Sequence, residues 1–194
     1  MNRFHRWYCQ SSRWRHKLDQ TILPWALSGI ELGDEVLEVG PGPSLTTDWL
    51  RLHSKQVTCV EIDFGLARSL NRRMVNTNVI VRCADGTAMP FPDSIFSSVV
   101  CFTAIHHVPS QILQDRLFTE VLRVLKPGGI FAGTDSMASL LMRLIHMGDT
   151  MVLVDPIALP SRLELAGFSG ARVDIGTGRF RFFARRPFQG VGAA

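Results

Sequence analysis

The sequence of 194 residues has few cysteines, few lysines and no long apolar run. Its four cysteines are far apart and form no CxxC pair, so we expect no zinc site and no other metal site. Apolar stretches such as residues 99–102 are far shorter than the roughly 18 residues that a membrane-spanning helix needs. The N-terminus has no apolar signal core, and we therefore expect a cytoplasmic protein without an integral membrane segment.

The chain also lacks a large excess of one charge. It has 21 basic and 17 acidic residues, so the basic excess gives a net charge of only +4. This excess is too small to indicate a nucleic-acid partner, and we expect none. Of the basic residues, 18 are arginines, and many of them gather near the two ends of the chain. Apolar residues make up 46% of the chain, which is typical of a globular domain at this length.

After residue 30, short apolar runs alternate with amphipathic segments, which indicates βαβ units and a mostly parallel sheet. The expected strands cover residues 36–39, 57–62, 79–83, 98–103, 130–134, 171–175 and 180–184, the last two as a hairpin. The expected helices cover residues 3–17, 19–28, 46–52, 65–74, 112–125 and 136–147. A further helix is expected to begin with a capping box of Ser161 and Glu164 and to end at Gly167.

The first expected strand runs into a turn rich in glycine and proline, with the sequence Val36-Leu37-Glu38-Val39-Gly40-Pro41-Gly42-Pro43-Ser44. Glycines let the backbone approach a ligand closely, and the helix that follows offers free N–H groups at its start. A dinucleotide-binding site would have a further glycine three residues after Gly42, where this chain has Leu45. A turn without a ligand is the alternative interpretation.

Acidic residues follow the next two strands, at the edge where α/β sheets bind ligands. Glu61 comes 21 residues after Gly40 and is placed to accept both hydroxyls of a ribose. Asp63 is expected instead to cap the helix that begins after it. Asp85 follows the third strand and is placed to accept a hydrogen bond from an adenine amine.

These blocks, in this order, resemble the class I S-adenosylmethionine-dependent methyltransferases, in particular the small-molecule group typified by the ubiquinone/menaquinone C-methyltransferases. The matching blocks are residues 36–42, 60–63, 84–92, 96–107 and 117–135, the last of which contains Glu120-Val121-Leu122-Arg123-Val124-Leu125-Lys126-Pro127-Gly128-Gly129. The chain departs from the family at Ser44, where a third glycine is usual.

The resemblance implies an α/β fold with a doubly wound, Rossmann-like sheet of seven strands, mostly parallel with the last strand antiparallel, and helices on both faces. It also implies a single methyltransferase domain over residues 1–194. Because the chain is short, with little inserted between the late strands, we expect an N-terminal helical cap (1–30), with the lid as one interpretation, to help cover the Rossmann-like core (31–194). S-adenosylmethionine is the implied cofactor, with S-adenosylhomocysteine as its product.

The resemblance further implies which residues bind the cofactor. Glu61 is expected at the ribose, Ile62 against the adenine ring, and Asp85 at the adenine amine. The whole implied set, from the methionine part of the cofactor to its adenine, is Glu38, Gly40, Pro41, Gly42, Thr103, Glu61, Ile62, Asp85 and Gly86.

Methyl transfer from a sulfonium is an in-line displacement, so the protein supplies mainly proximity and alignment. A base is needed only when the attacking atom must first lose a proton. His106 and His107 follow the fourth strand and are the candidate catalytic residues, because histidine titrates near neutrality. Asp135 is a further candidate, and a plain strand-to-helix turn is the alternative interpretation of the two histidines.

The N-terminal segment carries Phe4, Trp7, Tyr8 and Trp14 among its arginines and has three interpretations. It is a lid that closes over the site, a helix docked on the sheet with a solvated basic face, or a basic helix lying on an anionic membrane. Near the other end, Arg179, Arg181 and Arg185 alternate along a strand. That alternation favours a solvated strand face over a site for an acidic group or RNA.

The sequence therefore predicts an S-adenosylmethionine-dependent methyltransferase that acts on a small, apolar or aromatic acceptor. Two alternatives stay open. One is a quinone or lipid methyltransferase in peripheral contact with a membrane, and the other is a catalytically silent protein that only binds the cofactor. The acceptor atom, whether O, N or C, and the oligomeric state also stay open.

Overall fold

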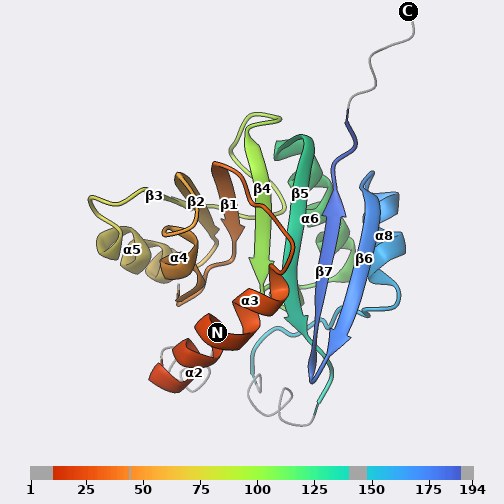
Figure 1. Ribbon diagram of the computed structural model, residues 1–194, viewed down its shortest axis with the longest axis horizontal. Coiled ribbons are helices and arrows are strands. Elements are labelled where there is room, and N and C mark those ends of the chain that lie inside the picture. Colours follow the sequence, from red (N-terminus) through yellow and green to blue (C-terminus); the bar gives the residue numbers. More distant parts are fainter. Residues whose placement is uncertain (1–10, 44, 140–147, 189–194) are drawn as a thin grey trace, which may run out of the picture.

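The computed structural model describes residues 11–43, 45–139 and 148–188, which form one seven-stranded sheet in the order β3-β2-β1-β4-β5-β7-β6 (Figure 1). The strands are β1 (Glu35–Val39), β2 (Gln56–Glu61), β3 (Val79–Cys83), β4 (Phe96–Phe102), β5 (Leu125–Ser136), β6 (Ser169–Gly176) and β7 (Arg179–Arg185). The helical elements are α2 (Ser12–Lys17), η1 (Leu18–Ile22), α3 (Leu23–Ala26), α4 (Leu45–Leu50), α5 (Phe64–Arg73), η2 (Ile105–His107), α6 (Gln111–Val124) and α8 (Leu159–Leu165).

The sheet is parallel except at its last strand. β1 pairs in parallel with both β2 and β4. β2 also pairs in parallel with β3, and β4 pairs in parallel with β5. β7 runs antiparallel to both β5 and β6, as predicted. The chain builds outward from β1 to β3 and then returns to add β4 beside β1. Ligands of such sheets bind outside the carboxyl ends of the strands at this switch point.

Helices cover both faces of the sheet, because residues along each strand alternate between two cores. Leu37 and Val99 face the core that α6 and α8 complete, where Phe131 and Phe182 meet edge to face with ring centroids 4.9 Å apart. The second core, on the opposite face, is completed by α3, α4 and α5 (Figure 1). None of the helices in the described part of the chain is long and apolar enough to span a bilayer.

The N-terminal helical segment is continuous from residue 12 to residue 26. Ser11 caps its start, since its Oγ accepts the N–H of Trp14 at 3.2 Å. The expected break near residue 18 is replaced by the π-helical turn η1. At the other end the carbonyl of Trp25 accepts a hydrogen bond from Arg181 Nη1 at 2.5 Å, which ties the segment to β7. Residues 1–10, with Phe4, Trp7 and Tyr8, lie outside the described residues.

Two expectations about helix ends were wrong. α8 begins at Leu159, so Ser161 lies inside its first turn and no side chain caps it. Pro160 explains the earlier start, because proline is well placed in the first turn of a helix. The helix expected over residues 136–147 does not begin at 136, which belongs to β5, and residues 137–139 are not helical. Residues 140–147 lie outside the described part.

The arginines of the C-terminal hairpin make specific contacts with backbone groups, so the strand face is more than a solvated surface. Arg181 pairs with Asp174 at 2.8 Å, and Arg185 donates to the carbonyl of Gly128 at 2.5 Å. Arg186 donates to carbonyls at the end of α6, including that of Arg123 at 3.0 Å. Arg185 and Arg186 thus hold the end of β7 and the residue after it against the start of β5 and the end of α6.

Candidate functional site

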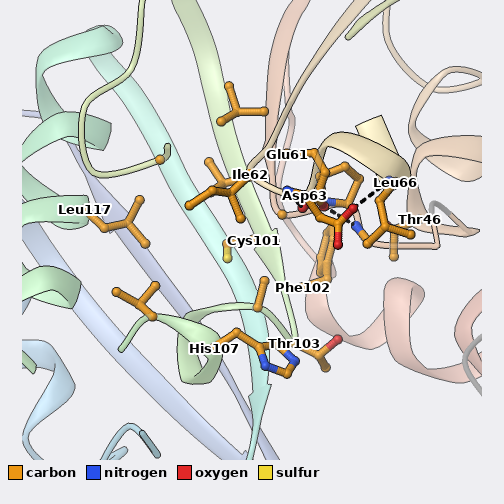
Figure 2. Close-up of a pocket in the computed structure, with 18 of the residues that line it drawn as sticks. Thr46, Glu61, Ile62, Asp63, Leu66, Cys101, Phe102, Thr103, His107 and Leu117 are labelled. Carbon is orange, nitrogen blue, oxygen red and sulfur yellow. Dashed lines mark hydrogen bonds between the residues drawn. The ribbon is translucent and has the colours of Figure 1, made fainter. Parts of the chain in front are cut away.

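A cavity of about 500 Å³ lies at the switch point of the sheet and is lined by the residues that follow β1, β2, β3 and β4 (Figure 2). Its volume falls in the range of small-molecule sites. The start of α6 and the N-terminal helix supply further walls, through Leu113 and Leu117 on one side and Trp14 and Leu18 on the other. The cavity has two chemically different ends.

The glycine turn after β1 forms one wall and depends on glycine at two positions. Gly40 and Gly42 have φ angles of +66° and +53°, in the left-handed region that favours glycine. A Cβ on Gly40 would also lie 2.8 Å from the Cβ of Ala104. The backbone of this turn can therefore approach a ligand directly, with Pro41 beside it in the lining. Ser44 lies outside the described residues.

Glu61, the last residue of β2, presents its carboxylate at the cavity wall. One oxygen accepts the N–H of Gly42 and the other accepts the N–H of Asp63, both at 2.9 Å. Burial raises the pKa of this carboxyl above its ordinary 4.5, and the two backbone donors oppose the rise. Each carboxylate oxygen has a second lone pair, so the fixed group can still accept two ligand hydroxyls.

The neighbouring residues continue this end of the cavity. Ile62 is 68% exposed and offers an apolar face among the lining residues. Asp63 caps α5, as predicted, by accepting the N–H of Leu66 at 2.9 Å. The carboxylate of Asp85 accepts the N–H of Thr87 at 2.8 Å, which holds it at the wall after β3 with Gly86 beside it.

Glu38 lies behind the glycine turn, one layer away from the cavity. It is 1% exposed, and its carboxylate accepts hydrogen bonds from the hydroxyls of Thr46 and Thr47. Burial raises the pKa of the Glu38 carboxyl, and the two hydroxyls oppose the rise. Thr46, which the sequence reasoning did not single out, lines the cavity in its place. Glu38 thus acts on the site through the start of α4.

The second end of the cavity is mostly apolar and contains a histidine. Figure 2 places Thr103 and His107 together, away from Glu61 and Asp63. Nδ1 of His107 lies 3.2 Å from the carbonyl oxygen of Thr150. A carbonyl only accepts hydrogen bonds, so Nδ1 is the donor in this contact.

The structure separates the two candidate histidines. His107 lines the cavity, whereas His106 is 2% exposed and does not belong to the lining. The ring of His106 instead pairs with Asp135, which is 0% exposed, with Nδ1 and Oδ1 2.5 Å apart. Neither His106 nor Asp135 is placed to take a proton from an acceptor in the cavity.

Several lining residues were missed by the sequence reasoning. Trp14 was named only within the N-terminal segment, for which a lid over the site was one of three interpretations, and Leu113 and Leu117 were assigned to the packing of an amphipathic helix. Asp149 and Thr150 carry no signal in the sequence, because their place depends on how residues 148–154 fold back onto the turn after β4.

The charge of the cavity is opposite to that of the whole chain. The charged side chains among the described lining residues are Glu61, Asp63, Asp85 and Asp149, all acidic, although the chain carries a net charge of +4. No lysine or arginine appears in the described lining. A cavity of this kind attracts a cationic ligand and disfavours an anionic one.

The sequence and the fold are similar to those of known proteins. A family model described as a methyltransferase domain matches residues 37–133, a span that contains the glycine turn, Glu61, Asp85 and His107. The ubiquinone/menaquinone biosynthesis C-methyltransferase of Chromobacterium violaceum is 31% identical over 107 residues, which cover 53% of this chain and 43% of that protein. The 24-methylenesterol C-methyltransferase 2 of Oryza sativa subsp. japonica is 32% identical over 116 residues, covering 57% of this chain and 31% of that protein.

The matched segment therefore spans less than half the length of either relative. Among solved structures, a SAM-dependent methyltransferase from Aquifex aeolicus superposes with a TM-score of 0.73 at 18% identity, covering 96% of this chain and 99% of that chain. This likeness extends the shared fold beyond the segment that the family model matches.

Proposed function

The chain belongs to the methyltransferase domain family, and on that premise we propose that it transfers the methyl group of S-adenosylmethionine to a small, apolar or aromatic acceptor. The observation that carries the proposal is the carboxylate of Glu61, held at the cavity wall by the N–H groups of Gly42 and Asp63. A carboxylate fixed in this way is suited to accept the two hydroxyls of a ribose.

The residues of the first end fit the cofactor. We assign the ribose to Glu61, the adenine face to Ile62, and the adenine amine to Asp85 with Gly86 beside it. The backbone of Gly40, Pro41 and Gly42 would hold the methionine part, with Glu38 supporting them through Thr46. Thr103, which lies beside His107 toward the second end (Figure 2), would contact the same part of the cofactor. The acidic lining supports a cofactor with a positively charged sulfur. When bound, S-adenosylmethionine supplies an activated methyl group on that sulfur.

The second end supports the acceptor. Val108, Pro109 and Leu113 give it an apolar lining, which favours an apolar or aromatic molecule. His107 is placed to accept a proton from the attacking group through Nε2. The walls of the cavity would hold the acceptor in line with the methyl group that the cofactor would supply, and His107 would take the proton that the acceptor loses.

The names of the relatives guide the choice of a first acceptor, since one is a ubiquinone/menaquinone C-methyltransferase. We would incubate the protein with S-adenosylmethionine labelled in its methyl group and with 1,4-naphthoquinone reduced to its quinol. Labelled quinol should form, and His107→Ala should slow it by ~100-fold, within the range for loss of a general base.

The control is His53→Ala, because His53 stacks on Trp49 with ring centroids 3.7 Å apart and lies outside the cavity lining. This variant should keep the wild-type rate. Equal rates for His107→Ala and wild type would contradict the role of His107. No labelled product from a protein that binds S-adenosylhomocysteine would contradict the quinol as acceptor while leaving the cofactor assignment in place.

A further inference from the structure

A buried carboxylate holds the residue before His107 at two points. Asp135, at the end of β5, accepts the backbone N–H of His106 with Oδ2 at 3.1 Å. Its other oxygen, Oδ1, lies 2.5 Å from Nδ1 of the His106 ring. Both side chains are almost completely buried, and neither lines the cavity. The pair therefore fixes both the backbone and the ring of one residue in the turn after β4.

Residues 148–154 form hydrogen bonds with the same turn, η2. The N–H of Val152 donates to the carbonyl of His106 at 2.8 Å, and the carbonyl of Thr150 binds His107 Nδ1. Gln114 Nε2 donates to the carbonyl of Val152 at 2.8 Å. The ring of His107 is thus set by a chain of contacts that begins at Asp135 and ends at Thr150.

The turn needs such support, because it is only a short 3-10 turn. η2 has three residues and no side-chain cap, and a single turn of this kind is marginal without outside contacts. Burying a carboxylate is also costly, and apolar replacements of buried ion pairs are often as stable or more stable. Stability alone therefore gives a weak reason for a histidine–aspartate pair at this place.

We propose that Asp135 and His106 are positioning residues, which hold η2 so that the His107 ring faces the acceptor end with its proton on Nδ1. This inference rests on the proposed function, in which His107 takes the acceptor proton. His106 itself stays out of contact with the acceptor. Its ring lies 4.2 Å from that of His107, centroid to centroid, so a shift of one residue moves the other.

The test reads the His107 ring directly and needs no acceptor. Nitrogen NMR of protein labelled with ¹⁵N-histidine distinguishes a protonated ring nitrogen from an unprotonated one. In the wild type, His107 should show one tautomer, with the proton on Nδ1. In Asp135→Asn, one carbonyl oxygen has to replace two carboxylate oxygens, and the His107 signals should shift to a mixture of tautomers.

A second pair of variants separates positioning from proton transfer. His106→Asn keeps an N–H close to the position of Nδ1 and should keep the wild-type His107 spectrum, whereas His106→Leu should show the mixture. Transfer to the quinol should fall about tenfold in Asp135→Asn and in His106→Leu but stay within about twofold in His106→Asn. Binding of S-adenosylhomocysteine should stay within about twofold in all three.

The matched control is Ser98→Ala, which removes a buried hydrogen bond to the carbonyl of Leu32 at 2.6 Å, in β4 but outside the cavity lining. It should leave the His107 spectrum unchanged. A wild-type spectrum in Asp135→Asn, or a His106→Asn variant as impaired as His106→Leu, would overturn the proposal. Failure of the wild type to bind S-adenosylhomocysteine would instead reject the proposed function, and the spectra would still decide whether the pair positions His107.

Discussion

The two ends of the cavity are built in different ways. At the cofactor end, the polar groups are fixed mainly by short-range contacts, with Asp85 bonded to the N–H two residues on and Glu61 to the N–H of Asp63 two residues on and to that of Gly42, 19 positions earlier. At the acceptor end, the contacts join distant residues, with His107 and Thr150 43 positions apart. The comparison teaches that the polar groups of the cofactor end are held by contacts of shorter sequence separation, whereas the acceptor end is assembled from more remote segments.

The largest expected effect is at the cofactor end. Glu61→Ala removes the acceptor of two ribose hydroxyls and leaves the N–H groups of Gly42 and Asp63 without their partner. We expect a loss of about 1–3 kcal/mol in binding of S-adenosylhomocysteine, roughly 5- to 150-fold, measured by calorimetry. Asp85→Ala should lose an amount within the same range.

Two comparisons make this prediction sharper. Glu61→Gln keeps one oxygen acceptor and should bind more tightly than Glu61→Ala. Wild-type affinity in both Glu61→Ala and Asp85→Ala would break the assignment of the adenosine to this end of the cavity.

The next effect tests whether the N-terminal helix serves the acceptor end. Trp14 lines the cavity and packs with Leu18, Ile22 and Leu45. Trp14→Ala should lower transfer to the quinol about tenfold, because the wall that excludes water is opened, while affinity for S-adenosylhomocysteine changes less than about threefold. Steady-state rates and calorimetry separate the two quantities.

The control is Trp49→Ala, since Trp49 lies outside the cavity lining. If Trp14→Ala lowers the affinity for S-adenosylhomocysteine more than it lowers turnover, the N-terminal helix serves cofactor binding. That result would contradict its assignment to the acceptor end. Removal of residues 1–17 should have the same pattern as Trp14→Ala.

A smaller effect is expected on the unfolding free energy and comes from Glu38, which lies behind the glycine turn. Burial raises the pKa of the Glu38 carboxyl above its ordinary 4.5, so the folded state holds its proton to higher pH than the unfolded chain. The contribution of Glu38 to the unfolding free energy should therefore fall as the pH rises from 4.5 through the raised pKa, while Glu120, whose pKa is lowered by Arg123, contributes in the opposite direction in both the wild type and Glu38→Gln. Glu38→Gln cannot ionise, so the fall due to residue 38 should be absent from its curve.

Urea unfolding between pH 4 and pH 7 measures both curves. Some slope should remain in Glu38→Gln, because burial also raises the pKa of Glu61. Glu31→Gln, a change at an exposed acid, should follow the wild-type curve. Parallel curves for Glu38→Gln and wild type would contradict the effect of burial on Glu38.

The smallest expected effect is at the outer surface of the N-terminal helix. The carboxylate of Asp48 in α4 accepts hydrogen bonds from Arg15 at 3.1 Å and Arg73 at 2.7 Å, which ties α2 to α4 and α5. Exposed ion pairs contribute ~1 kcal/mol or less, so Asp48→Asn should speed release of S-adenosylhomocysteine by about two- to fivefold. Stopped-flow measurements would record the release rate.

Salt screens exposed charges, so the difference between Asp48→Asn and wild type should shrink at high ionic strength. Asp34→Asn is the matched control, because it breaks another exposed pair, with Lys55 at 2.7 Å, outside the cavity lining. Equal release rates for Asp48→Asn and wild type at low salt would show that the helix leaves cofactor release unchanged.

The same division explains what could be predicted from the sequence. The strands from residue 35 onward and the cap by Asp63 follow from local patterns of apolar residues, glycine and acids, whereas the antiparallel last strand was implied by the resemblance to the methyltransferases. The expected set at the cofactor end lies at the cavity except for Glu38, which the structure places behind the glycine turn.

The acceptor end could not be predicted in this way. Two adjacent histidines look equivalent in sequence, and only the pairing of His106 with Asp135 in the next strand separates them. The places of Trp14 and Thr150 depend on contacts between segments that lie far apart along the chain. The start of α8 was predicted wrongly for a different reason. Ser161 and Glu164 have the spacing of a capping box, but Pro160 in the first turn places the start of the helix at Leu159.

The central claim is that the end of the cavity with Glu61 and Asp85 binds the adenosine of S-adenosylmethionine. The most direct test is a calorimetric titration of the protein with S-adenosylhomocysteine, with NAD as the comparison ligand. We predict binding of S-adenosylhomocysteine with a micromolar dissociation constant and no heat of binding with NAD. Binding of NAD, or of neither ligand, would contradict the account.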